Sequence, residues 1–286
     1  MNLCALNNLP NKNDKKGCLP RNHQNLVENS LKTSDKQAYN KCKELKSKDQ
    51  RQFCMVREAA KLDQQFYDTL KEYFKPIPPD SWKRNKTTWL SNFDINDVFK
   101  QYQKLNPALN HSLGVTSSDF NTSCGVFGFN HCRFVPEINK QYFMIINLSK
   151  HNEPGTHWVA LVINTNPESK SFGAKFFDSF GQGVPSSVYK YVSELKCKID
   201  SSCSSVKHDY NNRQFKLYQN RKKLQTSNTE CGIYCLAFIY LCLQNKDKNP
   251  EDIYKLLPHE FKGIDNRGAQ RPFFFVDPTF LVDNGL

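Results

Sequence analysis

One apolar segment near the C-terminal end constrains the fold of this chain most strongly. Residues 231–243 read CGIYCLAFIYLCL and carry no charge. A helix that is apolar on all sides needs neighbours on all sides, so this segment is expected in the middle of a domain. It is also shorter than the roughly 18 apolar residues that a membrane-spanning helix requires. The sequence therefore predicts a water-soluble domain packed around a central helix.

The overall composition bounds the class of protein. A chain of 286 residues can hold one large domain with an extension, or two modest domains. The first twenty residues contain no continuous apolar stretch, so we expect no secretory signal and an intracellular protein. The 11 cysteines are an odd number and include no Cys-x-x-Cys pair. Without an export signal, this pattern predicts reduced thiols, with a catalytic one possible among them.

The chain is strongly basic, with a formal net charge of +12. Residues 1–75 hold 15 Lys and Arg against 9 Asp and Glu. A second patch contains no acidic residue and consists of Arg213, Lys216, Arg221, Lys222 and Lys223. Such a balance favours an anionic partner, which could be nucleic acid, an acidic protein surface or a membrane face. A basic surface that is merely solvated explains the charge about equally well.

Three regions follow one another along the chain. Residues 1–34 are polar and show no clear period, which predicts a mobile tail. Residues 35–79 carry apolar side chains at helical spacing and end in a proline cluster at 76–79, which predicts a basic helical extension followed by a domain boundary. Residues 80–286 are expected to form the main domain.

The main domain contains both strand and helix patterns. Aromatic and β-branched stretches predict strands at 142–148, 157–164, 172–178 and 213–218. Helices are predicted at 92–102, with Asn92 or Asp94 as the cap, at 188–195 and at 231–243. The expected fold is α+β, a mixed sheet with the buried helix at its centre.

Cys231 stands at the start of the buried helix, directly after the polar residues 227–230. The unpaired N–H groups and the macrodipole at a helix N-terminus favour an anion, so a thiolate is favoured there. Gly232 beside it has no side chain to keep a substrate backbone away. A buried helical cysteine is common, however, and Cys235 and Cys242 are expected to be structural.

A histidine and an acid stand at strand ends upstream of this cysteine. His157 opens one predicted strand and Asp178 ends the next, 21 residues later. The ends of adjacent strands lie side by side, so the carboxylate can accept a hydrogen bond from the imidazole and orient it as a general base. Each residue alone is more often structural. Among the other histidines, His131 is the main rival.

Gln225 precedes Cys231 by six residues. Its side-chain amide can reach back over the helix N-terminus and, together with the backbone N–H of Cys231, bind a developing oxyanion. Glutamine is otherwise an ordinary loop residue, so this role depends on the other members of the set.

This set of residues resembles the adenain and ubiquitin-like-protein (SUMO) protease superfamily of cysteine peptidases. The matching segments are 155–158 (GTHW), 177–179 (FDS) and 225–232 (QTSNTECG), and papain-like enzymes differ because their cysteine comes first in the chain. Residues 89–95 (WLSNFDI) resemble the WLND-type helix start of the SUMO-protease branch, with Ser91 inserted. The resemblance implies that Trp89 and Trp158 line a narrow tunnel that admits only Gly-Gly.

Within the superfamily, residues 92–95 and 229–232 are most similar to the polyprotein-processing proteases of African swine fever virus and related large DNA viruses. This implies an endopeptidase that cleaves viral structural polyproteins after Gly-Gly, in the host cytoplasm (viral factory) and in the virion. DNA or an acidic peptide could act as an activator, as in adenain, and the basic patch beside Gln225 is the sole support for this in the sequence. We expect no cofactor, no membrane insertion and no metal, because the spacing of Cys124, His131 and Cys132 matches no zinc site.

Two other functions are compatible with these patterns. The same catalytic residues would serve a deconjugating isopeptidase for SUMO or a similar modifier. The basic charge alone would suit a nucleic-acid-binding protein with an inactive protease fold, whose binding would depend steeply on salt.

No two of the 12 glycines are adjacent, so the chain contains no Gly-Gly site of its own. We therefore expect the purified protein to keep its intact mass during prolonged incubation, as measured by mass spectrometry. A fragment that forms in the wild-type sample but not in the Cys231→Ala variant would contradict this prediction.

Overall fold

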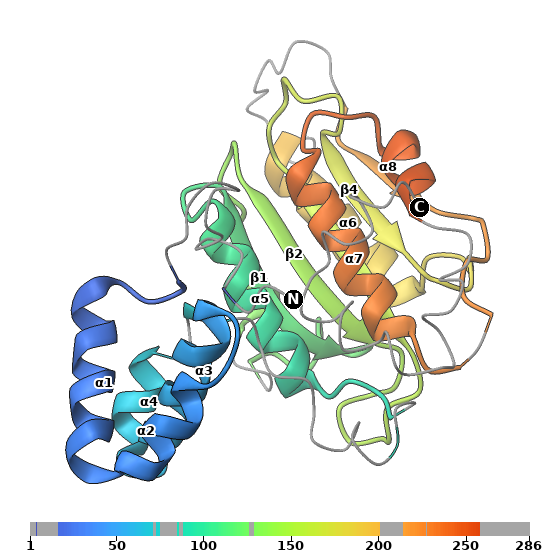
Figure 1. The fold of residues 1–286 in the computed structure, drawn as a ribbon. Helices are drawn as coiled ribbons and strands as arrows, with labels where there is room; N and C mark the ends of the chain where they lie inside the picture. The colour runs from blue at the N-terminus through green and yellow to red at the C-terminus, as the bar shows by residue number, and fades with distance from the viewer. Residues whose placement is uncertain are drawn as a thin grey trace. The chain divides into compact units, whose positions relative to one another are not determined.

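The computed structural model describes residues 4, 17–70, 73, 74, 85, 88–125, 129–200, 214–226 and 228–257. The chain divides into two compact units, residues 1–77 and 78–286 (Figure 1). The proline cluster at 76–79, expected as a boundary, lies outside the described residues.

The first unit is a small helical bundle. Its helices are α1 (Arg21–Ser34), α2 (Lys36–Lys43), α3 (Lys48–Ala60) and α4 (Gln64–Leu70). A capping box between Ser47 and Gln50 begins α3, and apolar residues of all four helices share one core. The helical extension is thus present, but the prediction of a tail over residues 1–34 is wrong for residues 21–34. Only Val27 and Leu31 of α1 are fully buried, and this single i, i+4 pair shows no clear period in the sequence.

Disulfides link several cysteines that were expected to be reduced. Cys4 pairs with Cys18, Cys42 with Cys54 and Cys124 with Cys132, and Cys197 is disulfide-bonded too. The expectation of reduced thiols is wrong for these residues. The fold brings each pair to Cα–Cα distances of 4.9 to 5.7 Å, within the range that a disulfide requires, and cysteine spacing does not show this. Among the described residues, the free cysteines are Cys231, Cys235 and Cys242.

The second unit is built on a five-stranded mixed sheet in the order β1-β2-β3-β4-β5. β2, β3 and β4 are antiparallel to one another, whereas β1 and β5 run parallel to their neighbours. The central strands are buried along their whole length, as expected for a sheet covered on both faces. The strands are β1 (Asn110–Ser117), β2 (Gln141–Asn147), β3 (Trp158–Asn164), β4 (Gly173–Phe177) and β5 (Lys216–Gln219).

Helices cover both faces of this sheet (Figure 1). On one face, α6 (Ser186–Asp200) packs through Val188, Tyr191 and Leu195 onto alternate residues of β2, β3 and β4. On the other face lie α5 (Asn92–Leu105) and α7 (Cys231–Gln244). There Phe99 of α5 contacts Phe143 with a ring-centroid distance of 4.9 Å, and Phe238 of α7 stacks on Phe177 at 4.7 Å. The predicted α+β fold with a central buried helix is confirmed.

The start of α5 differs from the prediction in its cap. Ser91, not Asn92 or Asp94, is the N-cap, and its hydroxyl accepts a hydrogen bond from the backbone N–H of Asp94. The Asp94 carboxylate in turn accepts from the backbone N–H of Ser91 at 2.8 Å. Ser91, the residue inserted relative to the WLND pattern, thus caps the helix.

One strand and one α-helix of the second unit had no prediction. β1 contains Gly114 at φ 82° and an irregular register between Ser112 and Val115, so its sequence resembles a turn. The last helix, α8 (Pro250–Leu256), is short and polar and begins with Pro250 at its first turn. No helix in the described parts of the chain has the length and apolar character needed to span a bilayer.

Candidate active site

Cys231 is the first residue of α7 and is buried, with 1% of its surface exposed. The preceding residue, Glu230, has non-helical backbone angles, so the helix begins at the cysteine itself. The hydroxyl of Tyr234, in the first turn, donates to the carbonyl of Leu224 at 3.1 Å and ties the helix start to the segment before it. The thiol therefore lies where the N–H groups and the dipole of a 14-residue helix favour a thiolate.

His157 and Asp178 form a direct pair beside this thiol. The Nε2 atom of His157 lies 2.7 Å from Oδ1 of Asp178, and only 13% of the histidine side chain is exposed. Since Nε2 faces the carboxylate, Nδ1 is the nitrogen that can exchange a proton with Cys231. Burial alone would lower the pKa of His157, but the hydrogen bond with Asp178, the interaction with Cys231 and the negative charges of both raise it to about 9.

The backbone around Asp178 is fixed by hydrogen bonds within a buried region. The N–H of Phe180 donates to the carboxylate at 2.8 Å. Asn220 bonds both sides of the Asp178 peptide, accepting from its N–H at 2.8 Å and donating to its carbonyl at 2.6 Å. The carboxylate is thereby held in one orientation toward the imidazole.

Phe180 covers the histidine. Its ring lies 5.0 Å from the imidazole with an interplanar angle of 31°, and the ammonium of Lys223 lies 5.4 Å from the centre of the phenyl ring. The turn that places Phe180 continues through Gly181, which has φ +71° and whose missing Cβ would lie within 3 Å of the backbone of residues 221 and 222. Only glycine fits this turn, which packs against the backbone of the basic segment at residues 221–223.

Gln225 is fully buried and is oriented by Ser179. The Ser179 hydroxyl donates to Oε1 of Gln225 at 2.6 Å, and the Ser179 carbonyl accepts from the backbone N–H groups of Leu224 and Gln225 at 2.8 and 2.9 Å. Because Oε1 is engaged, Nε2 is the end of the amide that can donate to an oxyanion.

The tryptophans differ in their surroundings. Trp158, the first residue of β3, is buried, and its indole N–H donates to the carbonyl of Leu90 at 3.1 Å. Trp89 precedes Leu90 and is half-buried. A Cβ added at Gly232 would lie 3.3 Å from Leu90 and 3.4 Å from Trp158, so this glycine lets both side chains pack onto the start of α7.

The rival histidine lies elsewhere in the fold. His131 is buried among the rings of Phe120, Phe129 and Tyr191 on the α6 side of the sheet, whereas α7 lies on the other side. Burial lowers its pKa to about 4. The structure thus brings His157 to Asp178 and Cys231, and places His131 in the core.

Three residues of the site had no prediction from the sequence. Ser179, Phe180 and Asn220 contact the predicted residues and fix their orientation. Their residue types alone do not indicate this positioning role. The only sequence signal is that Ser179 and Phe180 directly follow Asp178. Among the described residues, no cluster of three or more His, Cys, Asp or Glu side chains could hold a metal ion.

The fold brings a histidine, an aspartate and a cysteine together, and they follow in that order along the chain. The model of the adenovirus endoprotease family matches residues 123–268, about half of the chain, and the chain belongs to this family. The resemblance inferred from the sequence is therefore confirmed.

The individual relatives are viral proteins that carry protease names. A thiol protease of Acanthamoeba polyphaga mimivirus is 25% identical over 166 residues, covering 56% of this chain and 49% of the relative. A cysteine protease of African swine fever virus is 26% identical over 126 residues, covering 41% of this chain and 42% of the relative. The chain thus matches only about half the length of these relatives. The crystal structure of an African swine fever virus protease has the same fold, with a TM-score of 0.56 and 18% identity over 89% of this chain and 93% of that one.

As the pH rises, we expect the Asp178→Asn variant to lose its activity at a lower pH than the wild type does. The folded-state pKa of His157, about 9, lies above its ordinary 6.5, so the imidazolium and its pairing are present below 6.5 and are lost as pH rises through about 9. Without the charge of the Asp178 carboxylate, the pH at which activity falls on the alkaline side should move down toward 6.5. The measurement is kcat/KM from pH 5 to 10.

Asp97→Asn provides the matched control, because it removes the same charge from an exposed pair with Lys100 on α5. Its alkaline limb should coincide with that of the wild type. An alkaline limb in Asp178→Asn that coincides with the wild type would contradict the inferred coupling.

Loss of the Ser179 hydroxyl should weaken oxyanion binding through Gln225. We expect Ser179→Ala to lower kcat about 10-fold with little change in KM, less than the 100-fold or more of losing a donor outright. Alkylation of Cys231 by iodoacetamide forms no oxyanion, so its rate should not change. An equal loss in both rates would show that Ser179 supports the whole site and not Gln225 in particular.

Proposed function

We propose that this protein is a cysteine endopeptidase that cleaves after Gly-Gly, with Cys231 as nucleophile, His157 as acid and base, and Asp178 as the residue that orients the histidine. The observation that carries the proposal is the 2.7 Å bond between His157 and Asp178, with the ring also interacting with a cysteine at a helix N-terminus. Nucleophile, base and orienting group are the elements that acyl transfer requires.

The geometry supports a thiolate–imidazolium mechanism. With a pKa of about 9, His157 is protonated at neutral pH, which matches a thiolate on Cys231. The thiolate attacks the glycine carbonyl, while the Gln225 amide and the Cys231 backbone N–H stabilise the oxyanion. The intermediate collapses as His157 protonates the leaving amine. Neutral His157 then takes a proton from water, whose oxygen attacks the thioester; the C–S bond breaks, and the acid leaves while the thiolate–imidazolium pair is restored.

The selection of glycine rests on the resemblance and on the packing around Trp158. Trp158 is fixed by its bond to Leu90 and by contact with Gly232, next to the nucleophile. With Trp89 as the opposite wall, the passage toward Cys231 would leave no room for a side chain at the two positions before the cut. In this proposal Gly232 acts by letting Trp158 lie close to the helix.

The substrates we propose are viral structural polyproteins, cleaved in the host cytoplasm (viral factory) and in the virion. The viral source of the relatives and the fold shared with the African swine fever virus protease support this substrate class.

A second candidate function is the removal of SUMO or a similar modifier. It is favoured by one observation, that the relatives from other African swine fever virus isolates carry the name SUMO-1 cysteine protease. Such an enzyme would share the triad and differ in needing a surface that grips a folded modifier.

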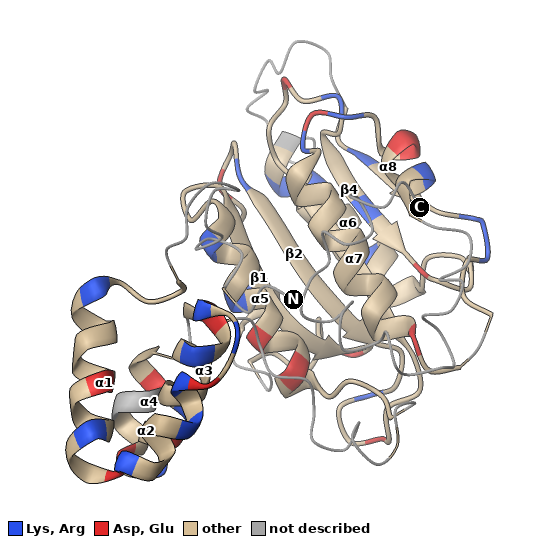
Figure 2. Ribbon diagram, viewed as in Figure 1, with Lys and Arg blue, Asp and Glu red and all other residues tan. Residues whose placement is uncertain are grey.

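An anionic activator, DNA or an acidic peptide, belongs to the same proposal. Arg221, Lys222 and Lys223 lie between Asn220, which holds Asp178, and Gln225 (Figure 2 shows the basic residues in blue). An anion bound to this segment would act directly on residues that fix the triad and the oxyanion donor.

Cleavage of an internally quenched peptide containing Gly-Gly-Ala tests the proposed function. Wild-type protein should cut after the second glycine, and Cys231→Ala should lose all turnover. Cys242→Ala is the matched control, because this thiol is buried near the far end of the same helix.

The assay is run with and without duplex DNA, and on a folded SUMO fusion that ends in the same sequence. Cleavage of the fusion alone would favour the isopeptidase, and turnover retained in Cys231→Ala would refute Cys231 as the nucleophile. Absence of any turnover would refute the peptidase function.

A further inference from the structure

A second cavity adjoins Trp158 and is not used by the chemistry described above. Its volume is about 290 Å³. Its walls are the C-terminal ends of the parallel strands β1 and β2, the loop at residues 150–155, the start of α5 and the side chain of Trp158. All these elements belong to the second unit, and the loop leads directly into His157.

One side chain in this cavity is held ready to donate a hydrogen bond. Asn147, at the end of β2, is 8% exposed, and its Oδ1 accepts from the backbone N–H groups of Ser149 and Thr156 at 3.0 and 3.1 Å. These bonds fix the amide so that Nδ2 is its remaining polar end. Nδ2 donates to no residue within the described parts of the chain. A ligand that accepts from this donor gains a hydrogen bond whose geometry is already set by the other end of the amide.

Gly155 keeps the approach to this amide open. A Cβ placed on Gly155 would lie 2.8 Å from Nδ2 of Asn147, so any other residue would press on the donor. The glycine itself is exposed. The loop therefore leaves space above the amide at the place where it passes toward the catalytic histidine.

The other polar groups of the cavity also favour an acceptor. Asn92, in the first turn of α5, lines it, and the N-terminus of this 14-residue helix contributes positive potential. Lys150 and Glu153 on the rim carry opposite charges. Next to Nδ2 of Asn147, a carbonyl oxygen is thus favoured over a cation.

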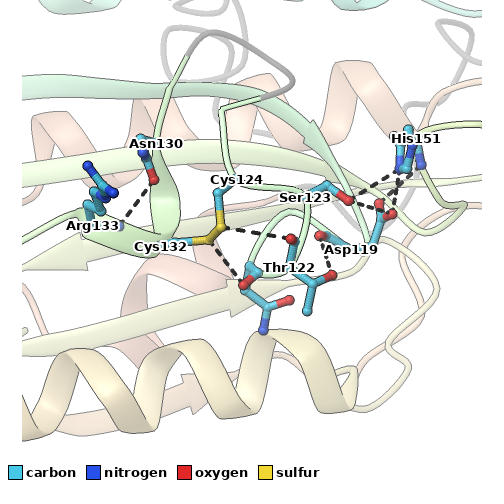
Figure 3. Close-up of a disulfide and its surroundings, with 9 residues drawn as sticks. Asp119, Thr122, Ser123, Cys124, Asn130, Cys132, Arg133 and His151 are labelled. Atoms are coloured by element: carbon cyan, nitrogen blue, oxygen red, sulfur yellow. Dashed lines mark hydrogen bonds and ion pairs between the residues drawn. A yellow bond between two sulfur atoms is a disulfide. The ribbon is translucent and has the colours of Figure 1, made fainter.

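The rim of the cavity is rigid before any substrate binds. Nδ1 of His151 lies 2.6 Å from the carboxylate of Asp119, which also accepts from the hydroxyl of Ser123 (Figure 3). The hydroxyl of Ser117 donates to the same carboxylate. The disulfide between Cys124 and Cys132 closes the segment that follows Ser123. A preformed rim lowers the entropy cost of binding a peptide.

We propose that this cavity, through Nδ2 of Asn147, selects a substrate side chain that bears a carbonyl oxygen (glutamine, asparagine or their acidic counterparts) within two positions before the Gly-Gly pair. The inference rests on the proposed function, because it takes the glycines to pass Trp158 on their way to Cys231. An extended chain advances about 3.3–3.6 Å per residue, so residues just before the glycines would reach the far side of the indole.

The test uses quenched peptides that differ only at the two positions before Gly-Gly-Ala, with Gln, Glu, Leu or Lys at each. At one position, wild-type kcat/KM should be about 10-fold higher for Gln or Glu than for Leu, the size expected for one hydrogen bond. The order of Gln and Glu shows whether the amide or the charge is preferred.

Asn147→Asp keeps the acceptor for the loop N–H groups and replaces the donor by a second oxygen. The ratio of Gln to Leu kcat/KM should then fall toward one. Asn166→Asp is the matched control, because its Oδ1 also accepts a loop N–H, that of Glu168, but it lies beyond the opposite end of β3. This variant should keep the wild-type ratio, and thermal melting checks that both variants are folded.

The outcomes separate the two proposals. Cleavage of every peptide with equal Gln and Leu rates would overturn the pocket and leave the peptidase function intact. A preference that survives Asn147→Asp in a folded protein would also overturn the pocket. If the wild type cleaves none of the peptides, the proposed function fails and this inference fails with it.

Discussion

The burial of α7 is the constraint on which the rest of the second unit depends. Every residue from Cys231 to Leu243 is buried, so the helix must be enclosed by β3 and β4, by α5 and by α8. Contacts on separate sides fix its position: the hydroxyl of Tyr102 donates to the carbonyl of Leu236, and the ring of Phe238 lies between Phe177 and Tyr254. A close-packed helix cannot shift without opening cavities. The location of its first residue, the thiol, is therefore a result of core packing.

The two residues after β4 connect the two halves of the site. Asp178 bonds the imidazole of His157, and its neighbour Ser179 bonds the amide of Gln225, so one short segment fixes both side chains. Asn220 ties the same segment to the chain that leads to Gln225. Because the groups share a peptide and a hydrogen-bond network, a change in one is expected to move the others, and their effects on rate will not be additive.

The sequence was sufficient for residues whose role shows in their own chemistry and position. Cys231, His157 and Asp178 each stand at the end of a strongly patterned strand or helix, and the structure brings these three together. Their catalytic roles stay predictions, as do those of Gln225 and the tryptophans. The residues that position them could not be found, because Asn220 is 42 residues from Asp178 and only tertiary folding joins them. β1, α1 and the disulfides were missed for the same reason, since each depends on contacts that no local period encodes.

The disulfides also clarify why a chain with 11 cysteines can contain one reactive thiol. Three cysteines are free within the described residues, and all three lie on α7. Burial raises the pKa of Cys242 to about 12 and that of Cys235 well above its ordinary value, so both stay protonated and unreactive at neutral pH. Cys231 has different surroundings, because it lies at the helix N-terminus beside the imidazole of His157. The difference between the three thiols is thus set by their position along a single helix.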